Sequence, residues 1–192
     1  MLIGISGHIG SGKSSTADYL IKKYGFQERT FAGPLKEACR ALFLLSDEQL
    51  YGSQEQKATA DPRWYGASPR SILQFVGTDL LRNRLDEIMS GLGNDVFIHN
   101  FRIWYSEFMA QGAHPVVVSD VRFPNEVDAI RSFGGKICRI SRNQRCVHAS
   151  NHSSETSMLD IKADYEIDNN GTIEQLYDQL DIIMKDFNKS IV

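Results

Sequence analysis

Cysteine is scarce in this sequence of 192 residues. The three cysteines, Cys39, Cys138 and Cys146, are odd in number and widely spaced, which argues against a disulfide framework and predicts reduced thiols in a cytoplasmic protein. Cys138 and Cys146 also lack the C-x-x-C spacing of structural zinc sites, so His148 and His152 are not expected to complete one. Cys39 is predicted to be a small residue on a helix face rather than a nucleophile.

Long apolar runs and an excess of positive charge are missing as well. No run approaches the roughly 20 residues of a membrane span, and the N-terminus enters a strand without a signal peptide, so we expect a soluble protein with no membrane partner. The chain has 21 Lys and Arg against 24 Asp and Glu, a net charge of −3. This balance disfavours a nucleic-acid polymer as a direct partner and suits a small anionic molecule that local cations bind.

A phosphate-loop motif stands near the N-terminus. Residues 7–14 read G-H-I-G-S-G-K-S, between an apolar run at 2–5 and a helical pattern at 15–24. In such a motif the backbone N–H groups cradle phosphates at a helix N-terminus, the Lys reaches the outer phosphates and the Ser hydroxyl joins the Mg²⁺ shell. We therefore expect a nucleoside triphosphate to bind, the alternative being a glycine-rich turn that binds nothing. The residues expected to hold it are His8, Gly10, Ser11, Gly12, Lys13, Ser14 and Ser15, with Ser14 also a metal ligand.

Strand and helix patterns alternate along the rest of the chain. Strands are expected at 1–6, 29–32, 115–121, 135–141 and 165–168, and helices at 13–24, 34–44, 68–89, 94–111, 125–133 and 172–187. This alternation predicts an α/β, three-layer P-loop NTPase fold with about five parallel strands and helices on both faces. The length fits a single domain, 1–192, with an inserted substrate-binding flap at about 45–95 and a short lid at about 142–155.

Two polar stretches, 51–67 and 142–155, resemble loops. Ligands bind at the carboxyl ends of the strands in an open α/β sheet, so both are candidate substrate flaps, with simple surface loops as the alternative. The aromatic helix at 97–109 could belong to the core or form the face of a homodimer, and the core is favoured because such stripes normally face inward.

The apolar strand at 115–121 is followed by residues that could handle phosphate and metal. Asp120 occupies the position at which phosphate-loop proteins commonly place a metal-facing carboxylate, and Arg122 could contact a second phosphoryl group through its planar donor fork. A helix cap and a surface arginine are the alternative. Asn125 and Glu126 open the next helix, where Glu126 is either a first-turn carboxylate or an acceptor for the sugar or base of a nucleotide.

Cations that could surround a migrating phosphoryl group lie at strand ends and flap starts. They are Lys36, Arg70, Arg122, Arg142 and Arg145. Gly33 would permit close backbone approach before Lys36. Gly77, Thr78 and Asp79 interrupt an apolar helical stripe, so these polar groups either face solvent or line a pocket, and the glycine favours close contact with a neighbour.

The order of several motifs resembles a known family. GHIGSGKSSTAD, FAGPLKEA, SPRSILQFVGTDLLRN, VVVSDVRFPNEVDAI, HSSE and DNNGTIEQL follow one another as in the deoxynucleoside monophosphate kinases of tailed bacteriophages and large DNA viruses. The resemblance covers nearly the whole chain, and AGPLK, QFVGTDL and D-x-R-x-x-x-E are its specific parts.

This resemblance implies Mg²⁺-dependent phosphoryl transfer from ATP to a deoxynucleoside 5′-monophosphate in deoxynucleotide biosynthesis, in the host cytoplasm if the source is viral. Lys13, Asp120, Arg122 and Arg142 would be catalytic, and Ser14 and Asp120 would bind Mg²⁺. The monophosphate would be surrounded by Gly33, Lys36, Arg70, Gly77, Thr78, Asp79, Arg122, Asn125 and Glu126. Arg142 would also bind ATP from the lid, and Asn169 and Asn170 would lie near adenine.

Some residues depart from the family pattern. Ser14 follows the loop lysine where the phage enzymes carry an acidic residue, and His8, Ile9 and Gly10 carry no fixed charge. Three alternatives stay open: a kinase for another small acceptor, such as phosphomevalonate or dephospho-coenzyme A; a nucleotide-dependent ATPase switch; and a catalytically silent nucleotide-binding module. The ATPase alternative is disfavoured because no acidic base adjoins Asp120.

Overall fold

The computed structural model describes residues 1–112, 114–143 and 161–189. The chain divides into two compact units, Met1–Thr30 with Tyr105–Val192, and Phe31–Trp104. Each unit is described by itself below.

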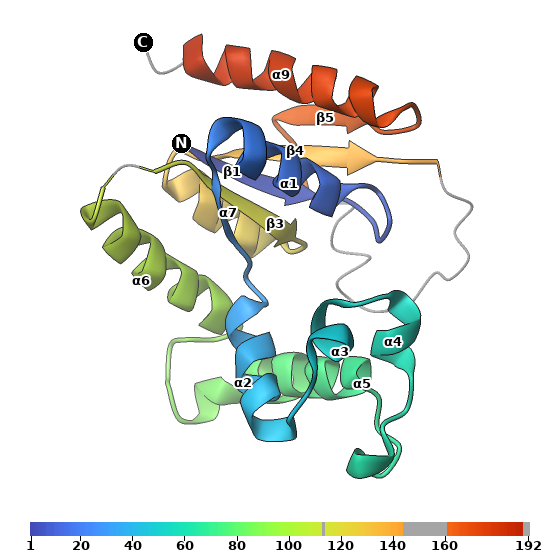
Figure 1. Cartoon of the computed structure of the whole chain (residues 1–192). Helices are drawn as coiled ribbons and strands as arrows, with labels where there is room; N and C mark the ends of the chain where they lie inside the picture. The colour runs from blue at the N-terminus through green and yellow to red at the C-terminus, as the bar shows by residue number, and fades with distance from the viewer. Residues whose placement is uncertain (113, 144–160, 190–192) are drawn as a thin grey trace. The chain divides into compact units, whose positions relative to one another are not determined.

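The first unit is built on a five-stranded sheet whose paired strands are all parallel, in the order β2-β3-β1-β4-β5 (Figure 1). The strands are β1 Leu2–Ser6, β2 Gln27–Arg29, β3 Val116–Val121, β4 Lys136–Ser141 and β5 Tyr165–Asp168. The predicted α/β fold with about five parallel strands is confirmed. In this order β1 lies between β3 and β4, so the loop that follows β1 emerges at the middle of the carboxyl edge, where open α/β sheets bind ligands.

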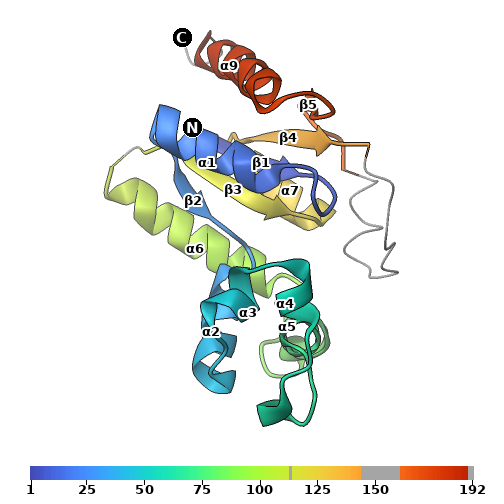
Figure 2. The same cartoon turned by 45° about the vertical axis from the view of Figure 1, so that its right-hand side comes forward.

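Helices cover both faces of this sheet (Figure 2). Helices α1 Lys13–Tyr24 and α9 Ile173–Lys189 pack on one face, where Ile5, Leu20 and Leu176 belong to one buried cluster. Helix α7 Pro124–Ser132 covers the other face, where a side chain on Gly4 would collide with Ile130. Three layers with two apolar interfaces bury β1 completely, as expected for a central parallel strand.

Strand β2 differs from the prediction of a strand at 29–32. It covers Gln27–Arg29 and pairs with β3, with Arg29 opposite Val118. The polar residues Gln27 and Glu28 are exposed on this edge strand, so pairing with β3 rather than hydrophobicity defines it. The correction places Arg29 at the carboxyl end of the strand instead of its start.

The second unit is helical. Its elements are α2 Gly33–Phe43, α3 Asp47–Tyr51, α4 Gln54–Ala58, η1 Pro62–Trp64, α5 Pro69–Gln74, η2 Phe75–Arg82, η3 Leu85–Glu87 and the first part of α6 Val96–Ala110. In α6, Phe101 is buried and its ring packs at a tilt on Phe31 with a centroid distance of 5.0 Å. The last part of α6 belongs to the first unit, and there Tyr105 packs on Phe133 of the same unit. The favoured core interpretation of this aromatic helix is confirmed for these rings.

The segment predicted as a helix at 68–89 is helical from Pro69 to Glu87, but it is not an α-helix throughout. At Phe75 the α-helix α5 changes into a π-helix that covers Phe75–Arg82, and a short 3-10 turn follows at Leu85–Glu87. Within the π-helix, Gly77 is buried against α2, where a Cβ atom would lie 2.6 Å from Leu35 Cδ2. The close contact expected of this glycine is therefore confirmed, and its partner is Leu35.

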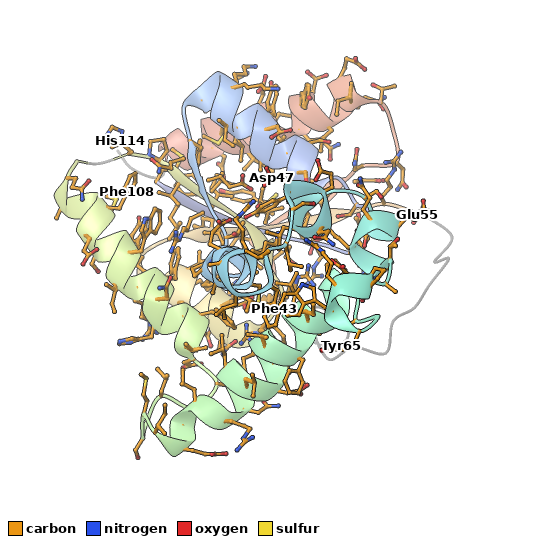
Figure 3. All side chains as sticks on the ribbon, turned by 60° about the horizontal axis from the view of Figure 1, so that its bottom comes forward. Phe43, Asp47, Glu55, Tyr65, Phe108 and His114 are labelled. Carbon is orange, nitrogen blue, oxygen red and sulfur yellow. The ribbon has the colours of Figure 1, made fainter. Side chains whose placement is uncertain are left out.

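The stretch at 51–67, expected as a loop, contains two short helical elements, α4 and η1. Ser53 and Gln56 form a capping box at α4, as Ser46 and Gln49 do at α3. The S-x-x-Q spacing is a sequence signature of a helix start, and it could have identified both helices. Figure 3 shows Glu55 on this part of the second unit and Tyr65, which is fully exposed, in the turn after η1.

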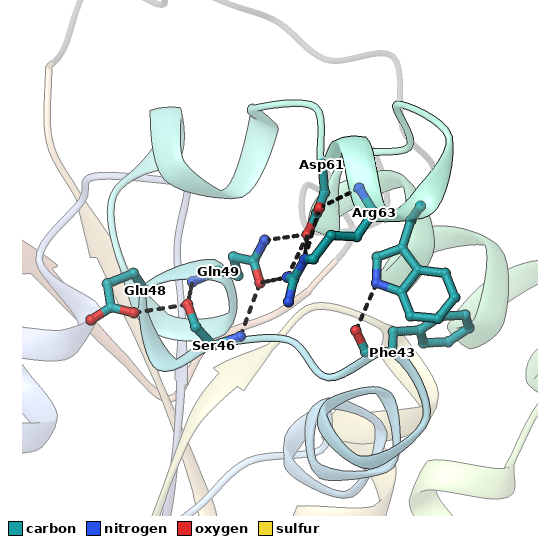
Figure 4. Close-up of polar contacts among 7 residues, drawn as sticks. Phe43, Ser46, Glu48, Gln49, Asp61 and Arg63 are labelled. Carbon is teal, nitrogen blue, oxygen red and sulfur yellow. Dashed lines mark hydrogen bonds and ion pairs between the residues drawn. The ribbon is translucent and has the colours of Figure 1, made fainter.

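A polar network fixes the turn from α3 to η1 (Figure 4). The buried carboxylate of Asp61 accepts hydrogen bonds from Gln49 Nε2 at 2.8 Å and from the Arg63 guanidinium at 2.6 Å, and the hydrogen bond from Arg63 is the main cause that lowers the pKa of Asp61. Trp64 Nε1 donates to the carbonyl of Phe43 at 2.7 Å. These contacts join α3 and η1 to each other and to the end of α2.

No helix within the described parts of the chain is long and apolar enough to cross a membrane.

Candidate nucleotide-binding site

The phosphate loop connects β1 to α1 in the first unit. Gly7 has φ +150° and Gly12 φ +109°, values that L-residues rarely adopt. A Cβ atom on Gly7 would lie 2.4 Å from the carbonyl oxygen of Ile140, and one on Gly12 would lie 2.3 Å from Asn169 Nδ2. The motif therefore needs glycine at both positions for two reasons, the backbone conformation and the close packing.

Lys13 folds over this loop. Its Nζ donates to the carbonyl oxygens of Gly7 at 2.6 Å and His8 at 2.8 Å. The ammonium group is thus held beside the loop backbone, at the N-terminal end of α1, where the backbone N–H groups and the helix dipole favour an anion. Ser14 and His8 are exposed, while Ser11 is buried.

The carboxyl end of β3 lies next to the start of this loop. Ser6 pairs with Val121, with an irregularity in the register that shifts Ser119 and Asp120 relative to β1. Asp120 and Arg122 are both half-buried at this edge. The structure therefore gathers Asp120, Arg122 and the loop at one edge of a single unit.

Sequence reasoning missed Arg29 at this edge. Burial lowers the pKa of its guanidinium, and the carboxylate of Asp120 acts against that shift, so the two groups are electrostatic neighbours. Arg29 had been expected at the start of a strand, which would have put it at the opposite edge. A polar edge strand carries little sequence signal, so only the pairing with β3 reveals the position of Arg29.

Glu126 shapes the turn between β3 and α7. It is 2% exposed, and its Oε2 accepts hydrogen bonds from the backbone N–H groups of Arg122 at 2.8 Å and Phe123 at 3.1 Å. A buried carboxylate that accepts two amide hydrogen bonds fixes the backbone from which Arg122 projects. Asn125, half-buried, lies beside it on the first turn of α7.

The lid prediction falls mostly outside the described residues. Arg142 is exposed, directly after β4, and Asn143 N donates to Asn170 Oδ1 at 2.6 Å. Residues 144–155 of the predicted lid, with Arg145, Cys146, His148 and His152, are not among the described residues.

In the second unit, Lys36 lies on α2 beside an aromatic ring. Its Nζ is 4.3 Å from the centroid of the Tyr51 ring, whose hydroxyl donates to Glu37 Oε1 at 2.8 Å. Gly33 is the first residue of the same helix, which gives Lys36 a place on its first turn.

The other expected acceptor residues lie on α5 and η2. Arg70 Nη2 donates to Gln54 Oε1, so the guanidinium is held against the start of α4. Thr78 is half-buried and Asp79 is exposed, on the π-helix that Gly77 seats against α2. Single-turn π-helical irregularities are frequent at functional sites.

The cysteines among the described residues are free thiols. Cys39 and Cys138 are both buried, and burial raises the pKa of each thiol, to about 12 for Cys138. Cys39 lies on α2, which agrees with its predicted place on a helix face. No group of three His, Cys, Asp or Glu side chains suited to a metal ion occurs among the residues that the structure describes.

The predicted site residues thus form two sets. The first unit carries His8, Gly10, Ser11, Gly12, Lys13, Ser14, Ser15, Asp120, Arg122, Asn125, Glu126 and Arg142, and the second unit carries Gly33, Lys36, Arg70, Gly77, Thr78 and Asp79. Each set contains cations, and the first also contains the phosphate loop.

Comparison with known proteins identifies the family. The family model described as deoxynucleotide monophosphate kinase matches residues 54–180. A protein of Acanthamoeba polyphaga mimivirus, provisionally named as a deoxynucleotide monophosphate kinase, is 52% identical over 182 residues, which cover 94% of each chain. The deoxynucleotide monophosphate kinase of enterobacteria phage T4 is 24% identical, over 96% of this chain and 98% of its own.

Among solved structures, the dephospho-CoA kinase from Campylobacter jejuni aligns with a TM-score of 0.53 and 15% identity, over 100% of this chain and 98% of that chain. At this identity the likeness concerns the fold alone.

Proposed function

The chain belongs to the deoxynucleotide monophosphate kinase family and is a phosphotransferase that acts on small nucleotides. We propose that it transfers the γ-phosphoryl group of ATP to a deoxynucleoside 5′-monophosphate. The product would be the deoxynucleoside diphosphate, supplied for DNA replication. The observation that carries the proposal is the pair of cations at the carboxyl edge of the sheet in the first unit. Lys13 folds over the phosphate loop, and Arg122 projects from the turn that Glu126 fixes.

The loop is proposed to hold the donor. The backbone N–H groups at the start of α1 and the ammonium of Lys13 are the donors proposed to bind the triphosphate. Ser14 and Asp120 fit a hard cation, because a hydroxyl on the loop and a carboxylate on the neighbouring strand are the oxygen ligands that Mg²⁺ takes. When bound there, Mg²⁺ would neutralise charge on the phosphates.

Phosphoryl transfer demands little covalent work from the protein, so positioning and positive charge are the main contributions. Arg122 offers a planar donor fork that matches a phosphoryl group, and Arg142 would add charge from the segment after β4. On the acceptor side, Lys36 and Arg70 of the second unit are the cations proposed to bind the monophosphate, with Gly33, Gly77, Thr78 and Asp79 around the nucleoside.

The test is an activity panel. Purified protein is incubated with ATP and Mg²⁺ and with each of the four main deoxynucleoside and four ribonucleoside monophosphates, and the diphosphates are quantified by ion-exchange chromatography. We expect phosphorylation of at least one deoxynucleotide well above background. If none is phosphorylated, the proposal fails.

Arginine variants test the proposed machinery within the same assay. Arg122→Ala should reduce kcat by about 100-fold or more with nearly unchanged ATP affinity, because the charge is needed mainly as the phosphoryl group migrates. Arg122→Lys should recover only part of the rate, since it restores charge without the fork. Arg131→Ala is the matched control, because Arg131 is exposed near the other end of α7, where it binds the carbonyl of Lys162 at 2.5 Å. Unchanged turnover in Arg122→Ala would remove Arg122 from the mechanism.

The alternative acceptors are tested in parallel. Dephospho-coenzyme A and phosphomevalonate replace the deoxynucleotide in the same assay, and ATP hydrolysis is measured with and without DNA. Faster turnover with another acceptor would reassign the substrate. Hydrolysis that DNA stimulates, with no response to deoxynucleotides, would instead favour an ATPase switch.

A further inference from the structure

The turn between β5 and α9 contacts the phosphate loop. Asn169, in this turn, is 8% exposed, and its Nδ2 donates to the carbonyl oxygen of Ser11 at 2.7 Å. This contact joins residues 158 positions apart in the sequence. A buried amide aimed at one carbonyl of the loop is a specific tertiary contact, since a buried polar group without a partner would cost free energy.

The side chain of Asn169 is itself held in place. Its backbone N–H donates to the carbonyl oxygen of Ser141 at 2.8 Å, which continues the parallel pairing of β5 with β4. Asp168, the last residue of β5, is fixed by Gln179 of α9, whose Nε2 donates to its carbonyl oxygen at 2.9 Å. The amide of Asn169 therefore projects from a rigid support and can impose a position on the loop.

The absence of a side chain on Gly12 leaves room for this amide. The hypothetical Cβ contact of 2.3 Å with Asn169 Nδ2 shows that the amide occupies the space a side chain at position 12 would need. The glycine thus allows two things at once, a left-handed backbone and the approach of Asn169 to the adjacent carbonyl.

The direction of one peptide plane follows from this contact. In a trans peptide unit the carbonyl oxygen and the next N–H point in opposite directions. When Asn169 holds the carbonyl of Ser11 on one side, the N–H of Gly12 is directed to the other side, away from Asn169. An N–H group that is turned away from Asn169 is left available to join the cradle of backbone N–H groups that binds phosphate oxygens.

We propose that Asn169 is a positioning residue that orients the Ser11–Gly12 peptide so that the Gly12 N–H faces the phosphates of ATP. The resemblance had placed Asn169 near adenine; its observed partner is the loop backbone. The inference rests on the proposed function only in taking ATP as the bound nucleotide.

The experiment compares Asn169→Ala with a control that weakens the same unit elsewhere. Asp181→Asn is that control, because Asp181 accepts hydrogen bonds from Tyr19, Tyr24 and Lys23 near the far end of α1, and Tyr24 is eleven residues, or about 16 Å of helix, from Lys13. Two properties are measured at pH 7: the Kd of a fluorescent ATP analogue, and hydrogen–deuterium exchange of peptides that cover residues 7–16.

We expect Asn169→Ala to raise the Kd about five- to tenfold, the effect of losing one hydrogen bond that orients a binding group, and to speed exchange in the loop. Asp181→Asn should leave both near the wild-type values. Asn169→Ser, which keeps a hydroxyl too short to reach Ser11, serves in place of the alanine variant if that variant does not fold.

Two results would overturn the inference: an unchanged Kd and unchanged loop exchange in the Asn169 variant, or equal changes in the Asp181 control, which would indicate general destabilisation. The exchange measurement needs no nucleotide and no turnover. A wild-type protein that phosphorylates no deoxynucleotide would therefore refute the proposed function without affecting this test.

Discussion

At the scale of single residues, neighbours decide what a charged group can do. The ammonium of Lys36 lies over the Tyr51 ring at 4.3 Å, and the Tyr51 hydroxyl is bound to Glu37. The ring attracts the cation through its quadrupole and limits its position. Glu126 shows the same dependence: its buried carboxylate accepts hydrogen bonds from the backbone N–H groups of Arg122 and Phe123, and it therefore fixes the turn from which Arg122 projects.

A prediction follows for Tyr51. Tyr51→Ala should raise the KM for the deoxynucleoside monophosphate about two- to fivefold, because a cation–π contact at an exposed site contributes about 0.5–1 kcal/mol to placing Lys36. Tyr51→Phe keeps the ring and should stay within about twofold of the wild type, and the KM for ATP should not change in either variant. Steady-state kinetics with each substrate varied in turn measures this.

Tyr65→Ala is the control for this series, since its ring is fully exposed. An equal effect of Tyr51→Phe and Tyr51→Ala would assign the role to the hydroxyl and its bond to Glu37 instead of the ring.

At the scale of elements, two helices of the first unit are joined by one carboxylate. Asp181 on α9 accepts hydrogen bonds from Lys23 at 2.6 Å and from the hydroxyls of Tyr19 and Tyr24 at 2.7 Å, all on α1. Tyr19 also stacks on Tyr177 with a centroid distance of 3.9 Å. These contacts fasten the last helix to the helix that begins at the phosphate loop.

This junction should make the free energy of unfolding depend on pH in the acid range. The hydrogen bond from Lys23, followed by those from the tyrosines, lowers the pKa of Asp181 to about 2, below the value of about 3.9 in an unfolded chain. A carboxyl whose pKa is lower in the folded state adds stability above pH 4, and that stability is lost as the pH falls toward 2. We expect the free energy of unfolding to lose about 1–2 kcal/mol from this group between pH 4 and pH 2, after allowance for solvent screening.

Urea unfolding followed by circular dichroism at several pH values measures that loss. Asp181→Asn should be less stable at pH 7 and show a shallower decline in acid, whereas the exposed Asp178→Asn on the same helix should follow the wild type. Parallel acid curves for the wild type and Asp181→Asn would contradict the assignment.

At the scale of the whole molecule, charge bears on the choice of partner. The net charge of −3 gives no long-range attraction to a polyanion, and the cations of the proposed site act on small phosphates. At 0.15 M salt we expect no binding of a fluorescent 20-base-pair DNA duplex at protein concentrations up to about 100 µM, measured by anisotropy. Saturable binding in the low micromolar range would reopen the macromolecular alternative.

The fold class was predictable because its evidence is local and repeated. Apolar strand runs alternate with helical patterns, and the phosphate loop marks the junction of β1 and α1, so a parallel α/β sheet follows from periodicity and one motif. The short helices α3 and α4 were missed although their capping boxes are visible in the sequence. The change from an α-helix to a π-helix at Phe75 was missed because no local pattern marks it; Gly77, within the π-helix, meets Leu35 in a contact between separate helices.

The sequence by itself determined the loop chemistry, the cations at strand ends and the resemblance to a kinase family, since these depend on residue types at short spacings. Only the tertiary structure decided that Arg29 neighbours Asp120 and that Asn169 holds the carbonyl of Ser11. Both contacts join residues that are distant in the sequence and that strand pairing brings together, so no local pattern encodes them. Short-range sequence patterns specify elements and motifs, including the first-turn position of Glu126 on α7, and the pairing of the five strands determines which distant side chains meet around them.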